Sequence, residues 1–172
     1  MFDLIKVFVD IALLRKGPQH LPSSGLLLLI IAAVYCALTV AFGRLIQHPD
    51  EPFLLRTLLE LALGLGWLWA MLALFGRHAR YLQTATAVIG TAALLTPAVL
   101  GLLAVVVKVG QNHPIIVPVV FALLAVLVWY VVITANILRS ALEVSLFAAI
   151  VLTLLYMGCE YFITTSLLTA IT

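Results

Sequence analysis

Two carboxylates that lie inside long apolar segments are the residues of this chain best placed to do chemistry. Glu60 and Glu160 each lie about two helical turns from the end of such a segment. An ionisable side chain in hydrocarbon costs about 3 kcal/mol even by the lower scales, so it indicates a functional site by default. Carboxylates at one depth could bind a cation, exchange a proton or receive the positive charge of a partner protein.

Two basic residues are placed to join these carboxylates. Arg56 precedes Glu60 by four residues, so both lie on one helix face and can pair. Lys108 ends a later apolar segment on the same predicted side of the membrane. We predict a polar cluster of Arg56, Glu60, Lys108 and Glu160, in which Glu160 meets Lys108, a hydroxyl group or a partner protein. A carboxylate there stays charged only beside a cation or water. The alternative is that both carboxylates only stabilise the bundle near the membrane interface.

No other pattern in the sequence predicts catalysis, a cofactor or a metal site. No Gly-rich phosphate loop and no Ser–His–Asp set occurs. The net charge of +2 and the lack of a basic run argue against nucleic acid as a partner. The four histidines fall in predicted loops without a second histidine or a cysteine at metal-ligand spacing: His20, His48, His78 and His113.

Long apolar runs must position the charged residues. Hydrophobic residues make up 65% of the 172 residues and charged residues 9%, whereas soluble domains have roughly 45–50% and 25%. Each of the five runs is close to or longer than the ~20 residues that cross a bilayer as a helix. The sequence therefore predicts an all-α integral membrane protein, a single membrane domain over residues 1–172 with a bundle of five transmembrane helices. These spans cover about 25–43, 53–75, 82–107, 115–138 and 144–168.

Residues 1–16 predict an amphipathic helix before the first span. Asp3, Lys6 and Asp10 fall on one narrow polar stripe of this helix, and apolar residues cover the rest. The charges interrupt the apolar run, and no small-residue cleavage site follows, so the segment is not a signal peptide. The apolar face can lie on lipid at the membrane interface, pack on the bundle, or do both.

The distribution of basic residues predicts the orientation in the membrane. Short connections make successive helices antiparallel neighbours, and basic residues favour the cytoplasmic side. We predict a cytoplasmic N-terminus and an external C-terminus. Short loops and small size favour the bacterial inner membrane, although a eukaryotic endomembrane protein would look similar. This orientation puts Lys6, Arg15, Lys16, Arg77, Arg80 and Arg139 inside, and Arg44, Arg56 and Lys108 outside.

Small residues recur at every fourth position, in three places. Such stripes let helix backbones approach closely in lipid, so we predict that they pack helices together within the bundle or against a partner helix. Pro97, in the middle of the third span, predicts a kink that serves packing or acts as a hinge. The stripes are Ala33, Ala37 and Ala41; Ala62, Gly66 and Ala70; and Ala141, Ser145 and Ala149.

Two stretches carry a family resemblance. In LALFGRHARYLQTATAVIGTAALLTPAVLG a span ends in Gly76 and charges, and the next span contains Pro97. In VWYVVITANILRSALEVSLFAAIVL a Trp-containing span turns tightly into one that starts with small residues. This layout, with a short N-terminal segment and five closely spaced spans, resembles the Yip1-domain membrane proteins. The resemblance implies a helical bundle without established enzymatic activity that works through protein or lipid contacts.

Two functions follow from these patterns. The first is a non-enzymatic accessory or scaffold protein that associates with lipids and with other integral membrane proteins or a second copy of itself. The second is a small transporter or channel component that uses Glu60, Glu160 and the bend at Pro97. A scaffold predicts a dry bundle with a partner interface, whereas a transporter predicts a path that reaches one of the carboxylates.

Overall fold

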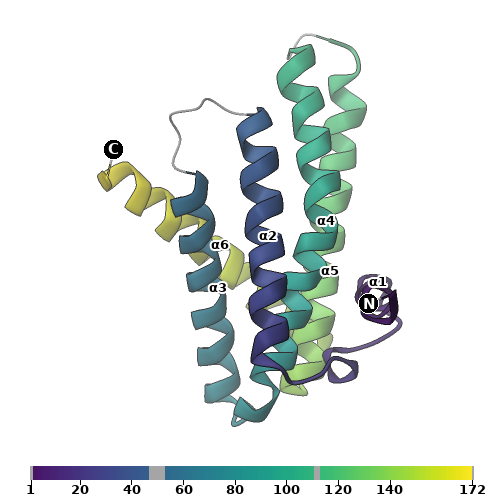
Figure 1. Ribbon diagram of the computed structural model, residues 1–172, viewed down its shortest axis with the longest axis vertical. Coiled ribbons are helices and arrows are strands. Elements are labelled where there is room, and N and C mark those ends of the chain that lie inside the picture. Colours follow the sequence, from purple (N-terminus) through teal and green to yellow (C-terminus); the bar gives the residue numbers. More distant parts are fainter. Residues whose placement is uncertain (1, 47–52, 111–112, 172) are drawn as a thin grey trace.

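The computed structural model describes residues 2–46, 53–110 and 113–171, and all regular structure in them is helical. The prediction of an all-α protein is confirmed. Figure 1 shows a bundle of long helices with a short N-terminal helix at its side. The helices are α1 (Phe2–Ala12), α2 (Gly25–Ile46), α3 (Phe53–Leu74), α4 (Tyr81–Val109), α5 (Ile116–Leu142) and α6 (Leu146–Ile171), with the 3-10 turns η1 (Pro18–His20) and η2 (His78–Arg80).

Four helices, α3 to α6, are long and apolar enough to cross a membrane. In α2 the apolar stretch Gly25–Ala41 is shorter, although the helix itself continues to Ile46. The structure is therefore that of a helical membrane bundle, in which four helices have the length and composition of a membrane span. The fifth span stays a prediction.

The long helices alternate in direction, but their packing does not follow their order in the chain. The main partner of α2 is α4 rather than α3, and α3 packs against α2 and α6. Figure 1 shows α2 beside α4, while α6 tilts away from α5 towards α3. This arrangement brings residues of α3 and α6 together, although the two helices lie far apart in sequence.

The buried core lies where the first half of α4 meets the last third of α5. Small residues such as Ala85 and Ala87 let α4 approach its neighbours closely. Threonine hydroxyls in this segment donate to carbonyls one turn back in their own helix: Thr84 Oγ1 to Arg80 O at 2.8 Å and Thr86 Oγ1 to Leu82 O at 2.7 Å. Because these hydroxyls are satisfied within the helix, they can be buried without water.

Two of the three predicted small-residue stripes do not pack against helices of this chain. Ala33, Ala37 and Ala41 on α2, and Ala62, Gly66 and Ala70 on α3, are all exposed. Ala141 and Ala149 are buried but lie on different helices, and Ser145 is exposed in the turn between them. Four-residue spacing marks one face of a helix but not which face packs, and in a helix that is apolar all round other faces compete.

The N-terminal helix forms as predicted but ends at Ala12 rather than at residue 16. Leu14 adopts a left-handed φ of 61°, Leu14 N donates to Ile11 O at 2.9 Å and Arg15 N donates to Asp10 O at 2.8 Å. This is the bond pattern of a Schellman motif, which closes a helix. Lys16 Nζ lies 2.8 Å from Asp10 Oδ2 and holds the pKa of Asp10 below its usual value.

Helix α1 packs on the bundle, one of the two placements that its amphipathic pattern predicts. Figure 1 shows α1 nearly end-on beside α4 and α5, so it crosses them steeply. Phe8, Ile11 and Ala12 are buried, and Trp129 Nε1 on α5 donates to Ala12 O at 3.1 Å. Ile5 remains exposed and leaves an apolar surface for lipid.

Helix α4 is helical on both sides of Pro97, which is exposed. Thr96 Oγ1 donates to Ala92 O at 2.8 Å, next to the backbone bond that proline removes. The kink at Pro97 stays a prediction.

Candidate functional site

A cavity of about 640 Å³ lies between the helices, and all five long helices α2 to α6 contribute to its wall. This volume lies within the range of about 300–1,000 Å³ that is typical of small-molecule sites. Most of the wall is apolar, above all along α4 and α5. The charged side chains of the wall come from α3 and α6, and they are three of the four residues of the predicted cluster: Arg56, Glu60 and Glu160.

Arg56 and Glu60 form the ion pair that their spacing predicts. Arg56 Nε donates to Glu60 Oε1 at 2.9 Å along the same face of α3. The Glu60 side chain is 26% exposed and that of Arg56 is 44% exposed. Both side chains line the cavity, and the guanidinium is the more exposed of the two.

Glu160 accepts a hydrogen bond from a hydroxyl group, which is one of the three types of partner predicted for it. Tyr156 Oη donates to Glu160 Oε1 at 2.7 Å, again across one turn of helix. Among the described residues no ion pair includes Glu160. The predicted place of Lys108 in the cluster is wrong: Lys108 lies at the exposed end of α4, whose cavity-lining part ends at Leu103. Helix α4 is long enough to carry that lysine beyond the cavity.

Aromatic side chains from four helices surround the Glu160 end of the cavity. Tyr35 of α2, Trp67 of α3, Tyr130 of α5 and Tyr156 of α6 all line it. The three tyrosines lie close enough to Glu160 to interact with its charge. The rings of Trp67 and Tyr156 are 6.1 Å apart at their centroids. Sequence reasoning missed this group, although the four-residue spacing of Tyr156 and Glu160 was a local signal of it.

Gly64 makes room for the Tyr156–Glu160 contact. A Cβ atom at Gly64 would lie 2.7 Å from Tyr156 Oη, closer than real contacts allow. A side chain at this position would therefore require the Tyr156 phenol to shift from its place against α3. By contrast, a Cβ atom at Gly66, one of the predicted packing residues, would meet no heavy atom within 4 Å.

Two of the polar atoms in the cavity wall, Trp67 Nε1 and Thr164 Oγ1, are buried without a hydrogen-bond partner among the described residues. An unpaired buried donor costs free energy of about 1–3 kcal/mol, and such groups are rare in folded proteins. Both atoms are therefore available to a polar group inside the cavity.

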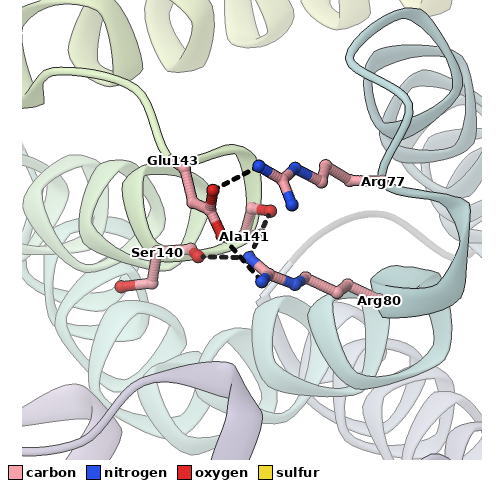
Figure 2. Close-up of polar contacts among 5 residues, drawn as sticks. All are labelled: Arg77, Arg80, Ser140, Ala141 and Glu143. Carbon is pink, nitrogen blue, oxygen red and sulfur yellow. Dashed lines mark hydrogen bonds and ion pairs between the residues drawn. The ribbon is translucent and has the colours of Figure 1, made fainter.

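A second polar cluster, outside the cavity, joins two connections of the bundle (Figure 2). Arg77 pairs with Glu143, and Arg80 Nη2 lies 2.7 Å from Glu143 Oε1. Arg80 Nη1 also donates to Ser140 O and Ala141 O, each at 3.2 Å. Glu143 has a left-handed φ of 59° at the end of α5. Sequence reasoning treated both arginines only as topology signals and missed this contact.

The described residues thus form two polar features: the cavity, and the cluster of Arg77, Arg80 and Glu143, which we call the clamp. Comparisons with protein-family models, with curated proteins and with solved structures find no match to this chain.

Proposed function

We propose that this protein binds an amphipathic molecule from the bilayer between its helices and acts as a small transporter or channel component. The observation that carries this proposal is the cavity of about 640 Å³, which holds Glu60 and Glu160 at one site between apolar walls. Helical bundles normally pack to high density with few voids larger than a water molecule. A space of this size, with ionisable groups in its wall, fits a binding site better than a purely structural core.

The cavity is accessible from the surface of the bundle. Its wall includes Leu124 and Leu127 of α5 and Tyr161 of α6, which are also exposed. In a bilayer such apolar surface faces lipid. A ligand with an apolar body therefore has a route from the hydrocarbon into the site.

The cavity can be tested with a matched pair of glycine substitutions in α3. Gly64→Leu would push Tyr156 aside and fill part of the cavity, whereas Gly66→Leu adds the same side chain at an exposed position. The neutral lipophilic fluorophore N-phenyl-1-naphthylamine should bind saturably to the wild type, measured by energy transfer from tryptophan. We expect Gly64→Leu to weaken binding at least tenfold, about 1.4 kcal/mol, and Gly66→Leu to leave it unchanged.

Circular dichroism must show that both leucine variants remain helical. Equal affinity of the wild type and the Gly64→Leu variant would contradict binding in this cavity.

A second proposed function, the accessory or scaffold role, draws on the two exposed stripes of α2 and α3. Small exposed residues at four-residue spacing suit close contact with a helix of another membrane protein or of a second copy. The Yip1-like layout belongs to this reading. It predicts that Gly66→Leu, rather than Gly64→Leu, changes the proteins that co-purify in mild detergent.

We further propose five spans with the N-terminus in the cytoplasm of a bacterial cell, with α2 as the first span. The basic residues support this orientation, since η2 and the α5–α6 turn lie at one end of the bundle (Figure 1). In a cysteine-free background, a cysteine at His113 should react with a membrane-impermeant maleimide in intact cells, and one at Gln19 should not. Both positions are exposed. The reverse labelling pattern would overturn the orientation.

A further inference from the structure

We propose that the occupant of the cavity is a lipophilic cation, an ammonium group on an apolar body, with Glu160 as its counter-ion. This inference rests on the proposed function, because it specifies the chemical class that the same cavity accepts.

The charges in the wall leave a place for one positive group. Arg56, the one arginine among the described residues of the wall, is paired with Glu60 at 2.9 Å. Glu160 has the Tyr156 hydroxyl as its hydrogen-bond donor, and it takes part in no ion pair of the described residues. The other titratable groups of the wall are Tyr35 from α2, Tyr130 from α5 and Tyr161 from α6, while α4 contributes only apolar side chains and Thr96.

The aromatic wall favours a cation over a neutral group. The face of an aromatic ring attracts a cation within about 6 Å of its centroid, and the gain rises to about 2 kcal/mol where the site is desolvated. Tyr35, Trp67, Tyr130 and Tyr156 line the same cavity as Glu160. A carboxylate among several rings is the combination of groups that recognises alkylammonium and related ions. The unpaired Trp67 Nε1 can in addition donate to an oxygen of the ligand.

An anionic occupant would fit this wall poorly. It would have to compete with Glu60 for Arg56, and it would approach Glu160 without a second cation to compensate. Like charges at low dielectric repel strongly, so the same wall that attracts a cation should reject an anion of equal size.

Tetraphenylphosphonium and tetraphenylborate form a suitable pair of probes, because they share size and shape and differ in the sign of their charge. We expect the purified protein in an uncharged maltoside detergent to bind tetraphenylphosphonium saturably in equilibrium dialysis, at least tenfold more tightly than tetraphenylborate. Glu160→Gln should weaken tetraphenylphosphonium binding at least tenfold, and Glu160→Asp should retain part of it. Glu143→Gln, the same substitution outside the cavity, should leave it unchanged.

The possible results separate this inference from the function on which it rests. Equal binding of both ions, or unchanged tetraphenylphosphonium affinity in Glu160→Gln, would overturn the cation site. In that case binding of N-phenyl-1-naphthylamine would still support the cavity as a binding site. Failure of all three probes to bind the folded protein would overturn the cavity itself. If Glu160→Gln does not fold, the ratio of the wild-type affinities for the two ions still tests whether the cavity prefers a cation. Displacement of tetraphenylphosphonium by phosphatidylethanolamine, but not by phosphatidylglycerol, would identify a lipid headgroup as the source of the ammonium. Displacement by a long-chain alkylamine, but not by either lipid, would identify a free amine.

Discussion

Gly90→Leu is expected to release the N-terminal helix from the bundle and to lower the free energy of unfolding by about 2–3 kcal/mol. A Cβ atom at Gly90 of α4 would lie 2.2 Å from Cε1 and 2.6 Å from Cδ1 of Phe8. Phe8 is only 7% exposed and is part of the core between α1 and α4. Since a leucine at this position and the phenyl ring cannot share the space, α1 has to move.

Limited trypsin digestion measures this release, because detachment of α1 exposes the backbone beside Arg15 and Lys16. Gly101→Leu on the same helix is the control, since a Cβ atom there meets no heavy atom within 4 Å. The double variant Phe8→Ala/Gly90→Leu should lose less stability than the sum of the single variants, because the collision is gone. Identical cleavage rates and melting temperatures of Gly90→Leu and Gly101→Leu would show that α1 does not dock through Phe8.

Arg80→Ala should cost about 1–2 kcal/mol, a large effect for a residue at the end of a helix. Hydrogen bonds of charged groups contribute about 1.5–3 kcal/mol when buried, and partial exposure reduces this. The guanidinium joins Glu143 to Ser140 O and Ala141 O, two of the last carbonyls of α5, which lack partners within the helix. Arg80→Lys should recover little of the lost stability, because an ammonium group lacks the planar array of N–H donors with which a guanidinium binds several oxygens at once.

Glu143 offers a finer test of the same clamp. Both Glu143→Ala and Glu143→Gly remove the carboxylate, but only glycine relieves the left-handed backbone with φ 59°. The alanine variant should therefore be less stable by about 1 kcal/mol, as measured by thermal melting in detergent. A double-mutant cycle of Arg80→Ala with Glu143→Ala should show losses that are smaller together than summed. Strictly additive losses would mean that the two side chains do not interact.

The features that could be predicted from the sequence are those set by local spacing. Runs of apolar residues have to form helices in a bilayer, because no water is present to satisfy the backbone, and the observed α3 (Phe53–Leu74) lies within one residue of its predicted bounds. The Arg56–Glu60 pair follows from a four-residue interval on one helix. Neither feature depends on which helices become neighbours.

The features that escaped prediction depend on which helix faces meet. Gly64 and Gly66 are two residues apart and chemically identical, yet one accommodates Tyr156 and the other faces outwards. A helix that is apolar all round carries no periodic signal to distinguish its faces. Contacts between distant segments, such as Arg80 with Glu143, likewise need the packing of α4 against α5 before they can form.

Helix α6 is held at one end and diverges from α5 at the other (Figure 1). Its 26 residues make a lever about 39 Å long, and Glu160 lies about 21 Å from its first residue. The clamp of Arg77, Arg80 and Glu143 fixes the turn from which this lever starts. By this geometry a rotation of roughly 10° about that turn displaces Glu160 by about 4 Å, while the first residues of α6 barely move. Small tilts of one helix therefore change the width of the cavity beside its carboxylate.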